Sequence, residues 1–133
     1  MSFTHKVTRS WSSSGSATVN YAHEVTAGLE VNLSEAIDDG ETDYDLAATI
    51  DYDNLKSFFM GSDQDVTVET NNPGGASGAA TQTFTLLANQ PLVWCTGDAD
   101  SCPVTADITA LYITNGSGST ANFELRALVD PSP

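Results

Sequence analysis

The chain has 133 residues, with 18 acidic side chains against 4 basic ones, which gives a net charge of −14 at pH 7. This length fits one domain that can bury a core of its own. So acidic a surface repels phosphate, which argues against nucleic-acid binding and against docking on anionic membranes. Hydrophobic residues make up 40% of the chain, an ordinary value for a folded domain, so the acidity does not indicate disorder.

The chain begins MSFTHKVTRSW, which lacks the apolar run of a secretory signal, and no later stretch approaches the roughly 18 apolar residues of a membrane span. We therefore expect a protein that is made in a cytoplasm and stays in solution.

Residues 1–16 are predicted to form an N-terminal arm or the first strand of the domain. Phe3, Val7 and Trp11 recur at every fourth position, with basic residues between them. Such a segment can add as a strand to the sheet of a neighbouring subunit. The alternative is a strand of the domain itself, and Trp11 is then a residue at the end of that strand.

Residues 17–133 alternate between apolar and polar side chains in the manner of half-buried strands. The alternation is found in ATVNYAHEV, GLEVNLSE, YDLAATID, DVTVET, TQTFTL, ITALYIT and ANFELRALV. Two apolar runs, residues 55–60 and PLVWC, predict strands buried on both faces. Turn-forming residues separate the strands at intervals of roughly 8–12 residues, as in sandwiches and jelly rolls. We predict a single all-β domain, an antiparallel, jelly-roll-like β-sandwich of about eight to ten strands.

Two segments of this domain are predicted to depart from the strand pattern. Helical structure is limited to one turn near residues 53–57. The polar stretch at residues 71–80 is predicted to be a mobile hairpin loop.

The sequence holds no motif for catalysis: neither a nucleophile elbow, nor HExxH, nor a glycine-rich phosphate loop is present. His5 and His23 are interpreted as structural or surface residues. The acidic turns at residues 38–45 and 98–100 are interpreted as solvated turns, with a calcium site as the alternative. We predict that the chain is not an enzyme, holds no metal or cofactor, and has no small-molecule substrate.

Two pairs of residues leave alternatives open. Phe58 and Phe59 are adjacent, so in a strand they face opposite sides, and one of them is a candidate for an interface. Cys95 and Cys102 flank the turn-like TGDADS, which permits a disulfide-closed loop, but two free thiols fit equally well. Trp94 is predicted to pack in the core.

Three stretches, LKSFFMGSDQDVTVETNN, TFTLLANQPLVW and TADITALYITNGSGSTANFELRALVD, resemble small structural proteins of tailed bacteriophages, above all capsid decoration (cement) proteins. The resemblance covers about residues 17–130. It implies a sandwich on the outer surface of the phage head, commonly a homotrimer, that binds the major capsid protein and clamps neighbouring capsid subunits. Synthesis in the host cytoplasm and a final location on the capsid exterior follow from it.

No functional residue is transferred from that family, and the candidate contacts come from the residues themselves. A tail or head-fibre module that binds glycan is the alternative function. The candidates for a capsid or subunit interface are Phe3, Val7, Trp11, Phe58 and Phe59.

Overall fold

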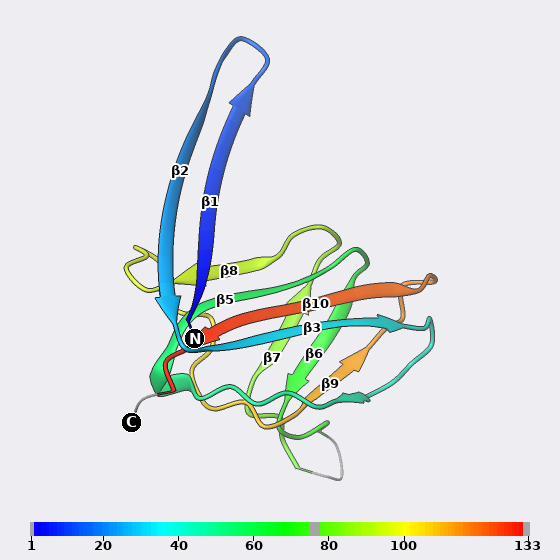
Figure 1. Ribbon diagram of the computed structural model, residues 1–133. Helices are drawn as coiled ribbons and strands as arrows, with labels where there is room; N and C mark the ends of the chain where they lie inside the picture. The colour runs from blue at the N-terminus through cyan, green and yellow to red at the C-terminus, as the bar shows by residue number, and fades with distance from the viewer. Residues whose placement is uncertain (1, 75–77, 132–133) are drawn as a thin grey trace.

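The structure is a computed structural model that describes residues 2–74 and 78–131, and these residues form strands and one short 3-10 helix (Figure 1). The strands are β1 (Phe3–Ser13), β2 (Ser16–Ala27), β3 (Leu29–Ile37), β4 (Tyr44–Leu46), β5 (Leu55–Ser62), β6 (Val66–Thr70), β7 (Thr83–Leu86), β8 (Leu92–Cys95), β9 (Leu111–Thr114) and β10 (Ala121–Val129). No helix in this described part of the chain is long and apolar enough to cross a bilayer.

The strands from β3 onward form two antiparallel sheets that face each other. One sheet has the order β3-β10-β5-β8 and the other has the order β4-β9-β6-β7. If these strands are lettered B to I along the chain, the sheets read B-I-D-G and C-H-E-F, which is the strand order of a jelly roll. The predicted all-β, jelly-roll-like sandwich is therefore confirmed. We call this part of the molecule the body.

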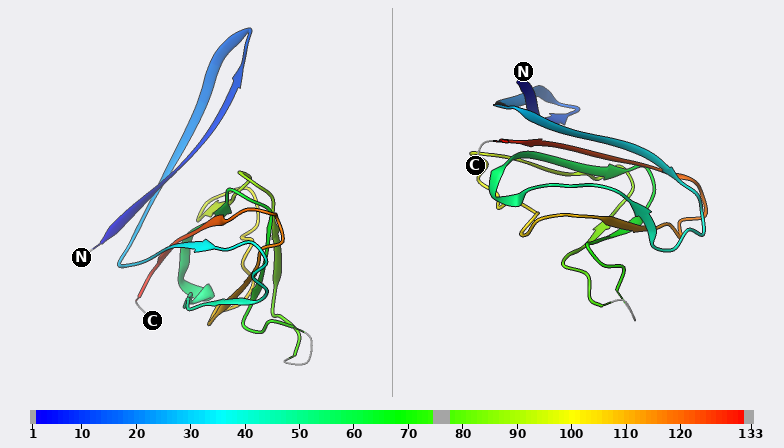
Figure 2. Two further views of the ribbon diagram at one scale, coloured as in Figure 1. Left: turned by 90° about the vertical axis from the view of Figure 1, so that its right-hand side faces the viewer. Right: turned by 60° about the horizontal axis from the view of Figure 1, so that its bottom comes forward.

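β1 and β2 form a separate two-stranded hairpin, which we call the arm (residues 3–27). Their pairing runs from Phe3 opposite Ala27 to Ser13 opposite Ser16, and neither strand joins a sheet of the body. Figures 1 and 2 show that the arm projects well beyond the sandwich. The boundary expected after residue 16 was wrong, because ATVNYAHEV pairs with β1 and the body begins only at β3.

The core lies between the two sheets and is centred on β10. Phe123, Leu125 and Ala127 alternate along β10, point inward and are fully buried. β5 contributes Phe58 and Met60, which pair with Ala127 and Leu125. Large apolar side chains at every second position of a central strand provide most of the burial that stabilises such a sandwich.

The segment YDLAATID forms a shorter strand than its alternation predicts. Only Tyr44–Leu46 pairs within a sheet, with β9. Ala48 and Ile50 are nevertheless buried, and Ile50 forms an isolated bridge with Ile108. The alternation between buried and exposed side chains thus continues to Ile50, as the sequence pattern predicts, although the ladder ends early. A 3-10 helix at Tyr52–Asn54 follows close to the predicted helical turn.

The long polar loop connects β6 to β7. Its ends are closed by hydrogen bonds from the Thr70 amide to the Gln82 carbonyl and from the Thr81 amide to the Thr70 carbonyl. Residues 75–77, at the middle of the predicted mobile loop, lie outside the described residues.

Candidate functional site

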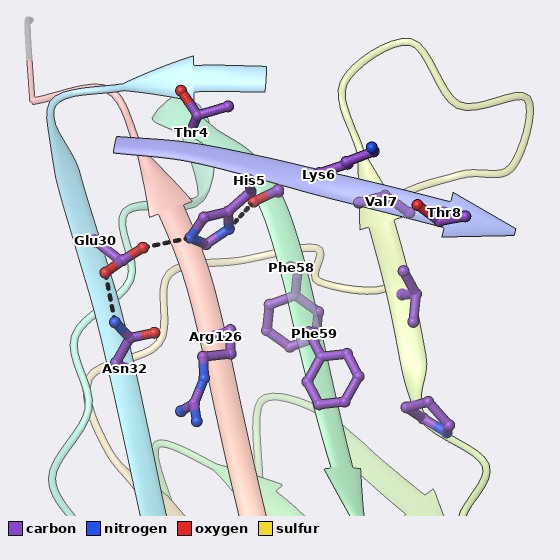
Figure 3. Close-up of a pocket in the computed structure, with 13 residues that line it drawn as sticks. Thr4, His5, Lys6, Val7, Thr8, Glu30, Asn32, Phe58, Phe59 and Arg126 are labelled. Atoms are coloured by element: carbon purple, nitrogen blue, oxygen red, sulfur yellow. Dashed lines mark hydrogen bonds and ion pairs between the residues drawn. The ribbon is translucent and has the colours of Figure 1, made fainter. Parts of the chain in front are cut away.

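The base of the arm crosses the outer face of one sheet. Figure 3 shows β1 starting beside β3 and passing over β10 and β5 toward β8. Because side chains alternate along a strand, the odd-numbered residues of β1 share the face that meets the sheet. The even-numbered residues of β1 are exposed, whereas Phe3, His5 and Val7 are half-buried.

His5 fixes the arm at the β3 edge of this sheet. Its Nδ1 lies 2.6 Å from Ser57 Oγ and its Nε2 lies 2.7 Å from Glu30 Oε2 (Figure 3). The hydrogen bond from His5 lowers the pKa of Glu30 below its ordinary value. The imidazole therefore bridges β5 and β3 beneath the arm.

Arg9 fixes the arm at the opposite edge, beside β8. Its guanidinium donates to both oxygens of Asp98, at 3.0 and 2.8 Å, and to the Val93 carbonyl at 3.4 Å. Burial alone would raise the pKa of Asp98, but the hydrogen bonds from Arg9 and from the Cys95 amide hold it below its ordinary value. A bidentate pair of this kind also sets the orientation of both side chains.

His23, from β2, completes a cluster at the same edge. One of its ring nitrogens, Cys95 Sγ and an oxygen of Asp98 lie within 4.8 Å of one another, which is compatible with metal binding. In this arrangement Arg9 already supplies the positive charge opposite Asp98, and burial raises the pKa of the Cys95 thiol, which favours its protonated form. We therefore interpret the cluster as a latch between arm and body.

A groove lies between the base of the arm and the outer face of the sheet, with a volume of about 630 Å³. Phe59 and Val93 pair across β5 and β8 and form part of its apolar wall together with Pro91. Arg126, on β10, lies beside Phe59 and donates to the Leu33 carbonyl at 3.0 Å (Figure 3). The groove therefore combines apolar walls with one fixed guanidinium.

The far end of the arm exposes aromatic side chains. Trp11 is 77% exposed, Tyr21 74% and Val19 45%. Trp11 pairs directly with Val19, and Tyr21 pairs with Arg9, so all three side chains share the face that docks on the body further down. We call Trp11, Val19 and Tyr21 the tip face.

The structure separates the residues that the sequence proposed for an interface. Trp11 lies on the tip face, Phe3 and Val7 lie at the base of the arm, and Phe59 lines the groove. Phe58 is only 1% exposed and belongs to the core, so its place among the interface candidates was wrong. The physical reason is the pairing of Phe58 with Trp94 and Ala127 on the inner face.

The cysteines and the acidic turns have defined surroundings. Of the two alternatives for Cys95 and Cys102, the structure has free thiols, with Cys95 buried and Cys102 half-buried. Asp39, in one of the acidic turns, accepts a hydrogen bond from the Gly118 amide at 2.9 Å. Trp94 packs against the core, as predicted.

Several contributors were not found from the sequence. Val19 and Tyr21 were assigned to a sandwich strand, and the pair formed by Arg9 and Asp98 joins residues far apart in the chain. The local pattern of ATVNYAHEV indicates that one side of the strand is apolar. It does not indicate whether that side packs on the body or stays exposed in a separate hairpin.

No protein-family model and no curated protein matches the chain. Among solved structures, a chain of the Bacillus endospore appendages, described as a novel family of disulfide-linked pili, is similar at 13% identity. The alignment covers 76% of this chain and 89% of that chain, with a TM-score of 0.34. At this TM-score the similarity supports no conclusion about fold or function.

Proposed function

We propose that this chain is a structural virion protein, a decoration (cement) protein that binds the major capsid protein on the outside of a tailed-phage head and stabilises the shell. The observation that carries the proposal is the arm with its exposed tip face. A two-stranded hairpin alone is marginally stable in water, and neighbouring exposed aromatic side chains mark a surface for a partner. The arm is therefore an element for assembly.

The body suits the same role. Jelly rolls occur in viral capsid and lectin domains, so the architecture is compatible with a coat protein, although a fold alone does not assign a function. The sequence stretches that resemble decoration proteins fall within this body. Its strong negative charge would keep densely covered particles apart.

Cementing does not require tight binding by each copy. When many copies bind to one shell and to one another, the combined contacts hold the layer even if each contact is weak. A protruding arm that reaches beyond its own body lets one copy touch a neighbour, which is what such a layer needs.

A glycan-binding tail or head-fibre module is the second candidate function. It is favoured by the exposed rings of Trp11 and Tyr21, which lie close together on one face of the arm. Sugars stack on such rings in many binding sites. Against it, a narrow ribbon offers no enclosing walls around a sugar.

The test is quantitative mass spectrometry of purified particles from the source, which measures the ratio of this chain to the major capsid protein. A ratio near one to one, with the chain released by mild treatment that leaves the shell intact, supports the decoration role. A few copies per particle would favour the tail or fibre role instead. Absence from the particles would overturn the virion proposal.

A further inference from the structure

We infer that the tip face of one copy docks into the groove of a second copy of this chain. The inference deepens the proposed function, on which it rests for the assembly role of the arm, by naming the partner of the tip face. Four features of the chain lead to it: the continuity of the arm's docking face, the distribution of charge, the lining of the groove and the direction of the arm.

The tip face continues a face that already binds this fold. The face of β1 that meets the body at its base presents His5, Val7 and Arg9 there and Trp11 at the tip. The base half of this face is covered by the outer face of the sheet, whereas the tip half is uncovered. On each copy its own arm covers the part of the sheet that binds the base, and the groove beside that contact remains open to the tip of a second copy.

The charges favour the same partner. The charged residues of the arm are Lys6, Arg9 and Glu24, which give it a net charge of +1. The rest of the chain has a net charge of −15, and the two parts add up to the net charge of −14. The arm is thus the cationic part of a strongly acidic molecule. The cations lie at the base of the arm, where Arg9 already pairs with Asp98 of its own body, whereas residues 10–22 contain no charged side chain. The uncharged tip can therefore approach the acidic body of a second copy without repulsion between like charges.

The groove offers a suitable receiving surface. Its volume of about 630 Å³ lies within the range of about 300–1,000 Å³ typical of sites that take a drug-sized ligand, so bulky aromatic side chains fit. Phe59, Pro91 and Val93 supply apolar contacts for Trp11. The guanidinium of Arg126 lies in the same groove, where an indole ring can stack on it.

The direction of the arm makes the contact intermolecular. The groove is lined by residues of β1 from Thr4 to Thr8, and the strand then runs past β8 and away from the body (Figures 1 and 3). Trp11 therefore lies beyond its own groove. Because tip and groove are different patches, the contact is heterologous, and it joins copies head to tail.

Sedimentation equilibrium of the purified chain tests the inference, at about 0.5 M NaCl to screen the repulsion between acidic bodies and with a reductant present. The wild-type chain should self-associate. The tip variant W11S/Y21S should weaken association more than about tenfold, as loss of aromatic anchors does. The groove variants F59S and V93E should weaken association to a similar extent. Two groove variants are used so that the test still stands if one of them fails to fold.

The matched control is L87S, which removes an exposed apolar side chain (46% exposed) from the body, far from the arm in sequence. It should associate like the wild type. The decisive experiment mixes the tip variant with a groove variant. Each is defective alone, but the mixture retains one intact tip and one intact groove, so a one-to-one dimer should form.

Any of three results with the docking variants would overturn the inference: a monomeric wild type at millimolar concentration, a tip variant that associates like the wild type, or a mixture that stays monomeric. Equal weakening by L87S would also overturn it, because association would then be unspecific. None of these results bears on the particle measurement, so the decoration role and the docking of arms fail separately.

Discussion

Gly97 has a positive φ of +95°, and a Cβ added there would lie 2.8 Å from Cε1 of His23. The residue therefore has two requirements at once, a left-handed backbone and room for the imidazole of the arm. Gly118 has the same φ of +95° but has nothing within 4 Å of an added Cβ. A substitution at Gly118 therefore tests the cost of the left-handed backbone alone, whereas a substitution at Gly97 adds the steric contact with His23.

Replacing Gly97 by Ala should loosen the arm, because the methyl group displaces His23 from the latch. We expect G97A to increase amide hydrogen exchange in β2 around His23 several-fold relative to the core amides of β10. The G118A variant should lower the stability of the body by a similar backbone term of about 1 kcal/mol, without changing exchange in the arm. Equal exchange of the β2 amides in both variants would contradict the latch.

The residue scale also shows the limit of sequence reasoning. The adjacency of Phe58 and Phe59 correctly implied that one faces inward and the other outward. Which one faces inward depends on the register with β10 and β8, which places Phe58 opposite Ala127 and Phe59 opposite Arg126. Register comes from contacts between distant parts of the chain, so a local pattern cannot supply it.

At the scale of elements, the arm is held by two groups of polar contacts at the two edges of one sheet. Each group depends on a carboxylate, Glu30 under His5 and Asp98 under Arg9. The pKa values of both carboxyl groups are lowered in the folded protein. A lowered pKa means that the folded state favours the charged form, so these contacts contribute fully above the ordinary carboxyl pKa of about 4.

The arm should therefore detach at acidic pH. As the pH falls through the lowered pKa values, Glu30 and Asp98 become protonated and their contribution to holding the arm is lost. Fluorescence anisotropy of Trp11, measured in a W94F background, should be constant above about pH 5 and fall below about pH 4.

The matched control is E30Q/D98N, which lacks both charges at every pH. Its anisotropy should be low throughout and should not change over this range. A wild-type arm that stays rigid at pH 3 while the body remains folded would show that apolar contacts alone hold it.

The strands themselves were largely predictable from alternation. GLEVNLSE, DVTVET and ANFELRALV became β3, β6 and β10. The apolar positions of β6 and β10 are buried, whereas Leu29, at the start of the edge strand β3, is 47% exposed. The arm was harder to predict, because β2 shows the same alternation as a sandwich strand. Its apolar side faces the body only near the base, and the alternation is the same whether a face is covered within the chain or exposed.

At the scale of the whole molecule, nearly all the negative charge lies on the body. A net charge of −14 repels itself, and folding brings these charges closer together. Screening by salt should therefore stabilise the folded state.

The melting temperature should rise with NaCl. Most of the rise should occur below about 0.2 M, because the screening length is already about 8 Å at 0.15 M. KCl should give the same curve, since screening depends on ionic strength and not on the identity of the cation. A melting temperature that fell between low and molar NaCl would contradict this account.

The crossing of the arm over the sheet has a mechanical consequence. β2 continues through Gly28 into β3, an edge strand, so a pull on the tip reaches the sheet first at Leu29. With that connection alone, the force would open the pairs between β3 and β10 one after another, as a zipper opens. The pair formed by Arg9 and Asp98 passes part of the force to the opposite edge, beside β8. The arm is thus attached at both edges of the sheet, and a pulling force on it is distributed over the strands between the two attachment points.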